Sequence, residues 1–226
     1  MRTLVERGEQ ERERLVPRDT FWPAQLAAAA AIVLYFALPG KLTVGPTWVL
    51  PSFEALLLVG LVVAMPTPKV KNYSPKRRYL MLALTALVTV AYLVSLGLLV
   101  HYLLQGGKAG GRQLVFSGVV LWVTNVLIFG VWYWEVDRGG PMVRLLDPKA
   151  RPDFLFPQMS DGQWAPPNWG PKFLDYLYVS STNATAFSPT DTMPLTRSAK
   201  MLMLVQGVAS LLTIGLIFAR AVNILA

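Results

Sequence analysis

Long apolar stretches limit what this chain can fold into. Five of them approach or exceed the roughly 20 residues that a helix needs to cross a bilayer. Only 15% of the 226 residues are charged, whereas a soluble domain carries about a quarter. We therefore predict an all-α fold, a polytopic membrane bundle of about five transmembrane helices, rather than a soluble protein with a large core. The predicted helices are 21–39, 48–65, 79–104, 114–135 and 197–225.

These stretches divide the chain into four parts. Residues 1–20 hold five Arg, four Glu and one Asp, which indicates a charged tail or surface helix rather than a signal peptide. Residues 21–135 contain the first four helices. Residues 136–170 are rich in turn-forming Gly and Pro and predict an irregular surface loop. Residues 171–226 contain a polar segment and the last helix.

Basic residues are distributed unevenly between the two sides of the predicted bundle. If the N-terminus is cytoplasmic, 17 basic residues face inward and three face outward. Cytoplasmic loops of membrane proteins are enriched in Lys and Arg. We therefore expect a multi-pass protein of the cell membrane, with its N-terminus in the cytoplasm and the lipid bilayer as its main partner. The same bias explains the net charge of +8 without nucleic acid.

The composition also argues against an enzyme. There is no cysteine and only one histidine, which excludes thiolate zinc sites and multi-histidine metal sites. The sequence lacks H-E-x-x-H, G-x-S-x-G and phosphate-binding glycine motifs. We therefore predict no catalytic residue, no metal and no cofactor.

A polar segment, residues 178–196, precedes the last apolar stretch and reads Y-V-S-S-T-N-A-T-A-F-S-P-T-D-T-M-P-L-T. Lipid cannot satisfy its backbone, so the segment must be buried in protein or line a cavity. Apolar residues in 173–178 share one helical face after Pro171, which predicts a short helix starting there. A short helix, an extended polar strand and a long helix form the re-entrant arrangement of ion-channel filters.

The polar segment resembles the P-loop of two-helix potassium channels. A typical pattern of that family, Y-F-S-F-T-T-L-T-T-V-G-Y-G-D-I-V-P-V-T, aligns with it without a gap. The identical positions are Tyr178, Ser180, Thr182, Thr185, Asp191, Pro194 and Thr196. Where the family has T-V-G-Y-G, residues 186–190 read A-F-S-P-T. Both filter glycines are replaced and one new residue is proline, so the resemblance does not imply potassium selectivity.

This resemblance implies an oligomer, most simply a tetramer, around residues 182–191, with ions as possible partners. The candidate pore residues are Thr182, Asn183, Thr185, Ala186, Phe187, Ser188, Thr190 and Asp191. The alternative is a non-conducting scaffold or partner subunit that kept the P-loop shape for assembly. Five crossings would put the segment on the cytoplasmic side, whereas potassium channels hold theirs outside. Either the loop is inverted, or the helix count differs by one, or the resemblance is convergent.

Three further motifs resemble an uncharacterised actinobacterial family of multi-pass membrane proteins. They are V-W-Y-W-E-V-D-R-G-G-P at 131–141, D-F-L-F-P-Q-M at 153–159 and F-L-D-Y-L-Y at 173–178. This resemblance covers most of the chain and implies no known activity. The charged residues of the first motif, Asp137 and Arg138 among them, could form an interfacial cluster that fixes the long loop.

Polar residues inside predicted membrane helices form a second candidate set, because charges there are costly and are usually functional. Glu54 and Arg220 would lie roughly 9 Å below the same surface at 1.5 Å per residue, so they either pair or snorkel separately. His101 could join such a pair or be an interfacial residue. Asn125 and Gln206 lie in the middle of helices, where they could bond to a neighbouring helix or line a water path.

Overall fold

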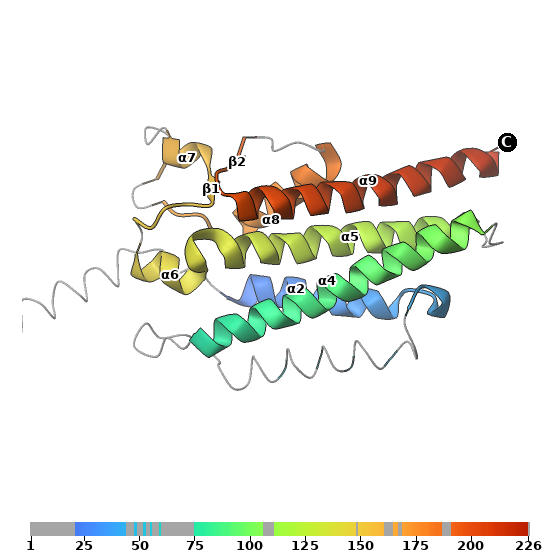
Figure 1. Ribbon diagram of the computed structural model, residues 1–226, viewed down its shortest axis with the longest axis horizontal. Coiled ribbons are helices and arrows are strands. Elements are labelled where there is room, and N and C mark those ends of the chain that lie inside the picture. The colour runs from blue at the N-terminus through green and yellow to red at the C-terminus, as the bar shows by residue number, and fades with distance from the viewer. Residues whose placement is uncertain are drawn as a thin grey trace, which may run out of the picture.

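The computed structural model describes residues 21–43, 75–105, 111–147, 149–160, 169–186 and 191–225, together with 48, 52, 55, 59, 165 and 166. Five longer helices form an elongated bundle (Figure 1): α2 (Trp22–Phe36), α4 (Pro75–Leu104), α5 (Gly111–Val136), α8 (Phe173–Ala186) and α9 (Arg197–Leu225). The shorter elements are η1 (Gly40–Leu42), η3 (Asp137–Gly139), α6 (Pro141–Leu146), β1 (Phe154–Leu155), α7 (Pro157–Ser160) and β2 (Met193–Pro194).

Three of these helices are long and apolar enough to cross a membrane. Their apolar segments are Arg78–Leu104, Gly111–Gly139 and Arg197–Ala219, with 27, 29 and 23 residues. Helix α2 has 15 residues and extends about 22 Å, less than the roughly 30 Å hydrocarbon core. The predicted helix 48–65 lies largely outside the described residues. The described chain therefore fits a membrane-embedded protein with three spanning helices, and the predicted count of five is not confirmed.

Helix α5 is the centre of the bundle and packs against α2, α4, α8 and α9. The most apolar 18-residue stretch of α5 is 67% buried, against 28% for α9. Two glycines allow close neighbours. A Cβ atom added to Gly118 would collide with the Ile217 side chain of α9, and one added to Gly130 would lie 3.3 Å from Leu177 Cα of α8. Small residues are the usual means of close helix approach in membranes.

Helix α8 enters the bundle from the end where α9 begins. It runs antiparallel to α5, because Leu177 lies beside Gly130 and Ser180 bonds to Val126 (2.7 Å). It runs parallel to α9, because Gln206 bonds to Ser180 and Ser210, four residues on, bonds to Ala184. The chain then returns to the same end, where β2 pairs with β1 (Figure 1). The predicted short helix after Pro171 is confirmed, since α8 runs from Phe173 to Ala186.

The segment 136–170 was predicted to be an irregular surface loop, but it contains regular secondary structure. It contains η3, α6, β1 and α7. Strand β1 pairs antiparallel with β2, with Phe154 opposite Pro194 and Leu155 opposite Met193. Phe154 and Phe156 are buried against other aromatic rings. Burial of these rings explains why the segment folds onto the end of the bundle.

Candidate functional site

Gln206 is the centre of a buried hydrogen-bond network between α5, α8 and α9. Its side chain is fully buried. The amide nitrogen donates to the Ser180 carbonyl (3.0 Å) and to Ser180 Oγ (2.7 Å). The amide oxygen accepts from Asn183 Nδ2 (2.9 Å) and from the Tyr133 hydroxyl. Both ends of the amide are satisfied, so one side chain joins three helices.

Asn183, one of the candidate pore residues, faces into this network rather than away from the bundle. Besides Gln206, its Nδ2 reaches the Met203 carbonyl of α9 (3.0 Å). One turn deeper, Ser210 Oγ donates to the Ala184 carbonyl (2.6 Å). These bonds hold α8 against α9 through two successive turns, where hydrocarbon would offer no alternative partner.

Asn125 of α5 extends the network to α4, so that it joins four helices. Its Nδ2 donates to the Tyr92 hydroxyl (3.0 Å) and to the Gln206 carbonyl (3.3 Å). The predicted bonding of Asn125 and Gln206 across helix pairs is therefore confirmed. We call this set of buried side chains the polar core: Tyr92, Asn125, Tyr133, Ser180, Asn183, Gln206 and Ser210.

The predicted extended filter strand is helical over 182–186, because α8 continues to Ala186. Thr182 Oγ1 bonds to the Tyr178 and Val179 carbonyls (3.1 and 3.0 Å), and Thr185 Oγ1 bonds similarly within α8. Without the filter glycines, nothing in this stretch breaks the helix. Both hydroxyls therefore donate to backbone carbonyls of α8 itself, on the outer side of the helix.

The remaining candidate pore residues do not join this arrangement. Ala186 is exposed at the end of α8, and Asp191 is exposed before β2. Phe187, Ser188 and Thr190 lie outside the described residues. Of the eight candidates, the structure thus brings Asn183 together with Asn125 and Gln206 and leaves Thr182 and Thr185 on the outer face.

The predicted pairing of Glu54 with Arg220 stays a prediction. Glu54 and the side chain of Arg220 lie outside the described residues. His101 lies in the last turn of α4, is exposed, and lines a groove between α4 and α9.

Asp137 is the centre of a second polar site, at the end of the bundle where α8 and α9 begin. It is fully buried. One carboxylate oxygen accepts from the backbone N–H groups of Asp153 and Phe154 (2.8 and 3.2 Å). The other accepts from the Tyr176 hydroxyl (2.6 Å) and lies 3.7 Å from Arg138 Nε. Asp137 thus holds residues 153 and 154 of the long loop, as predicted for this cluster, and the interfacial position of the cluster stays a prediction.

Asp153 links the same cluster to α9. Its carboxylate accepts from the Arg138 backbone N–H (2.8 Å) and from Thr196 Oγ1 (2.6 Å). Thr196 Oγ1 in turn accepts from the Ala199 N–H (3.3 Å), as expected of a helix N-cap. The start of α9 is thus tied to the end of α5.

Arg144 places a buried cation beside the Asp137 backbone. Its Nη1 donates to the Trp134 and Asp137 carbonyls (2.6 and 2.9 Å). Its guanidinium lies over the Tyr176 ring, 5.0 Å from the centroid. Carbonyl dipoles and an aromatic face both stabilise a desolvated cation. We call Asp137, Arg138, Arg144, Asp153 and Tyr176 the end cluster.

The sequence D-R-G-G explains how the chain turns within the end cluster. Arg138, Gly139 and Gly140 all have positive φ, at 53°, 77° and 99°. At Gly140 a Cβ atom would also lie 3.2 Å from both the Glu135 carbonyl and Arg78 Nε. Only glycine combines this backbone conformation with so close an approach.

The three motifs at 131–141, 153–159 and 173–178 meet at this end of the protein. Aromatic rings connect them: Phe154 lies 5.0 Å from Tyr133, Phe156 lies 5.4 Å from Tyr176, and Trp134 lies 6.1 Å from Phe173. Since Tyr133 also belongs to the polar core, the end cluster and the polar core are continuous through this aromatic layer.

Several members of these sites were not predicted. Tyr133 lies in W-Y-W, a pattern typical of interfacial anchoring, and its bond to Gln206 depends on tertiary packing. Tyr176 appeared only within the F-L-D-Y-L-Y motif and was given no role. Ser180 was noted only as a position shared with potassium channels. The one available signal was that a hydroxyl in a membrane helix needs a partner.

Comparison of the chain with protein-family models, with curated proteins and with solved structures finds no match. Within the described residues, no group of three or more His, Cys, Asp or Glu residues could hold a metal ion.

Proposed function

We propose that this protein is a non-conducting scaffold or partner subunit of a larger membrane complex. One observation supports it above all: polar side chains that a pore would need on its axis bond within a single chain. Gln206 and Ser210 are fully buried, and Asn183 is nearly so. Each bonds to an adjacent helix. A re-entrant helix anchored in this way favours a rigid support over a hydrated path.

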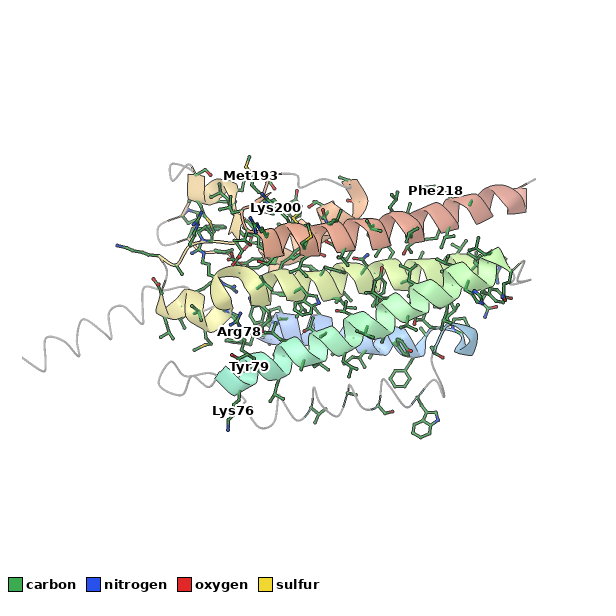
Figure 2. All side chains as sticks on the ribbon, viewed as in Figure 1. Lys76, Arg78, Tyr79, Met193, Lys200 and Phe218 are labelled. Carbon is green, nitrogen blue, oxygen red and sulfur yellow. The ribbon has the colours of Figure 1, made fainter. Side chains whose placement is uncertain are left out.

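The outer surface of α9 is the natural contact for a partner subunit. Its spanning segment is the least buried of the three. Exposed large apolar residues recur along it, including Leu204, Val208, Leu211 and Phe218, and Figure 2 shows Phe218 far from the end cluster. We propose that this surface meets another membrane helix in a multi-pass complex of the cell membrane. The cytoplasmic N-terminus predicted from the basic residues belongs to the same proposal.

An oligomeric channel is the second candidate, and two features favour it. Helix α8 enters the bundle from the end where α9 begins, and β2 lies at that same end, an order typical of a pore helix and the chain after it. The outer side of α8 carries Thr182 and Thr185, which a tetramer could turn toward a common axis. In this proposal, common descent with potassium channels would explain the aligned framework residues.

Ion flux in liposomes distinguishes the two candidates. The purified protein would be reconstituted under K⁺, Na⁺, Cl⁻ and H⁺ gradients, with an ionophore as positive control. A scaffold gives no flux above that of protein-free liposomes. Flux that changes in Thr185→Val would overturn the scaffold proposal and support the channel.

A photo-crosslinking amino acid at position 211 or 218 tests the partner directly. A scaffold or subunit should give a discrete cross-linked product in native membranes. The same probe at buried Leu121 is the matched control and should give none. Reaction with lipid alone at both exposed positions would argue against a protein partner on α9.

A further inference from the structure

Positive charge is concentrated at the end of the bundle that holds the end cluster. Exposed basic side chains there lie at the starts of α4 and α9, in the α6–β1 connection and directly before α8. They are Lys76, Lys149, Arg151, Lys172, Arg197 and Lys200, and we call them the basic surface. The exposed acidic residues of the described chain at this end are Asp147 and Asp191. The basic surface therefore has an excess of positive charge.

Contacts between helices place the starts of α4 and α9 at this end. Helix α4 runs antiparallel to α5. Asn125 bonds to Tyr92 (3.0 Å), and Trp132, nearer the end of α5, bonds to Thr89, nearer the start of α4 (2.9 Å). The start of α4 therefore lies beside the end of α5. The start of α9 is tied to the same place through the bond of Thr196 to the end cluster.

Figure 2 shows the same arrangement. Lys76 and Lys200, which come from different helices, both lie at the end of the molecule opposite to Phe218. Lys172 directly precedes α8, which enters the bundle from this end. The basic surface is thus assembled by the fold from segments that are far apart in the sequence.

These cations lie at the level where the membrane-spanning segments end. On this side the segments begin at Arg78 and Arg197, and the third ends at Gly139. Lys76 and Arg197 are within two residues of these limits, which is about 3 Å along a helix axis. Lys200 lies one turn further in, and its long side chain can extend back to the interface. Lipid phosphates lie just outside the hydrocarbon core, at this same level.

Exposed aromatic residues mark the level independently of the charges. Trp22, the first residue of α2, is 60% exposed, and Tyr79, near the start of α4, is 67% exposed. Helix α2 begins at this end, because the rings of Phe21 and Trp134 lie 5.3 Å apart. Trp and Tyr are enriched where membrane helices meet the headgroup layer. Their position agrees with that of the basic surface.

The opposite end of the bundle carries less charge. Among the side chains that the structure describes, Arg112 in the first turn of α5 is the one exposed Lys or Arg at that end. The attraction of anionic headgroups falls off within a Debye length, so the two leaflets of a bilayer would meet different surfaces of this protein.

We propose that the basic surface binds the headgroups of anionic phospholipids in the leaflet that it faces. Its charge complements that of the headgroups, and the spanning helices hold its cations at the level of the lipid phosphates. Clusters of Lys and Arg beside a membrane span are typical of such binding. The proposal requires only that α4, α5 and α9 cross a membrane, and it applies to a scaffold and to a channel alike.

Spin-labelled lipids measure this preference. The protein would be reconstituted in phosphatidylcholine bilayers with trace spin-labelled phosphatidylglycerol or phosphatidylcholine. Electron paramagnetic resonance gives the motionally restricted fraction of each label. Phosphatidylglycerol should be preferred at least about tenfold at low salt, because several cations contribute about fivefold each. The preference should largely disappear at about 1 M NaCl, where the Debye length is about 3 Å. No preference at low salt would overturn the proposal and leave the cations to an acidic partner protein.

Two arginines in the first turns of spanning helices give a matched pair. Arg197→Gln should lower the preference about fivefold, whereas Arg112→Gln, at the opposite end, should leave it unchanged. Lys76→Gln repeats the test from α4 and should act as Arg197→Gln does. Equal losses in Arg197→Gln and Arg112→Gln would overturn the proposal. Inorganic phosphate at the ionic strength of the NaCl series should compete no better than chloride, and stronger competition would assign the surface to a free anion instead.

Discussion

The two junctions of α9 differ in what holds them. On the side of α5 and α8, Gln206 and Ser210 make directed hydrogen bonds in a fully buried setting. On the side of α4, an apolar groove of about 660 Å³ separates the helices. Lipid tails are as apolar as Leu, so apolar contact alone does not drive membrane helices together. Polar bonds therefore fix one junction of α9, whereas the other is left to lipid or a partner.

The glycines follow the same division. Gly130 of α5 lies where Leu177 of α8 approaches to within 3.3 Å of a Cβ position, in the contact between the two helices that bond to α9. Gly97 lies where no atom comes within 4 Å, at the open junction. Glycine thus allows close helix packing at Gly130 and leaves open space at Gly97.

The largest expected effect comes from removing Asp137. In Asp137→Ala, two backbone N–H groups and the Tyr176 hydroxyl lose their acceptor, and the neighbouring Arg138 loses its counter-ion. Breaking a buried charge arrangement of this kind costs about 3 to 5 kcal/mol. Unfolding in detergent by SDS titration measures it. Asp147→Ala, an exposed carboxylate nearby, is the control, and equal destabilisation by both would refute the central role of Asp137.

A matched glycine pair sharpens the comparison of the junctions. Gly130→Leu should destabilise the protein by about 3 kcal/mol, because the added atoms meet the Leu177 backbone. Gly97→Leu should be neutral or stabilising by up to about 1 kcal/mol, since Leu has the higher helix propensity. Thermal unfolding in one detergent compares them. Similar losses in both variants would mean that the α4–α9 junction is closed.

Gln206→Leu tests the polar core itself. The substitution leaves Asn183, Ser180 and Tyr133 without a shared partner, and we expect a loss of about 2 kcal/mol. Leu211→Ala, on the exposed face of the same helix, should cost much less. A neutral Gln206→Leu would show that packing rather than hydrogen bonding holds this junction.

Much of the bundle could be predicted from the chain. Apolar stretches predicted α4, α5 and α9 within a few residues, because length and apolarity alone decide whether a helix spans a bilayer. Pro171 and the apolar face that follows predicted the start of α8. The acidic and basic residues around Asp137 predicted a cluster that fixes the long loop.

Partners across the bundle could not be predicted in the same way. That Gln206 bonds to Ser180 and Asn183 depends on how deep α8 reaches beside α9, which no local pattern encodes. The predicted end of this helix was wrong, because the resemblance to potassium channels suggested an extended strand at 182–186, where α8 continues to Ala186. The replaced filter glycines were the contrary signal: without them, Thr and Ala continue the helix and satisfy their own hydroxyls.

The smallest change in stability is expected for substitutions on α8, where it distinguishes the buried face from the outer face. Ser180→Ala removes a hydroxyl that donates to the Val126 carbonyl and accepts from Gln206, so a loss of about 1 kcal/mol is expected. Thr182→Val, two residues on, removes a hydroxyl that bonds only within its own helix, and its change in stability should stay within about 0.5 kcal/mol. Unfolding midpoints of both variants in detergent give the difference. If Thr182→Val is the more damaging, the outer face of α8 is itself packed against another chain, and the hydroxyls on that face, rather than the polar core, hold the assembly together.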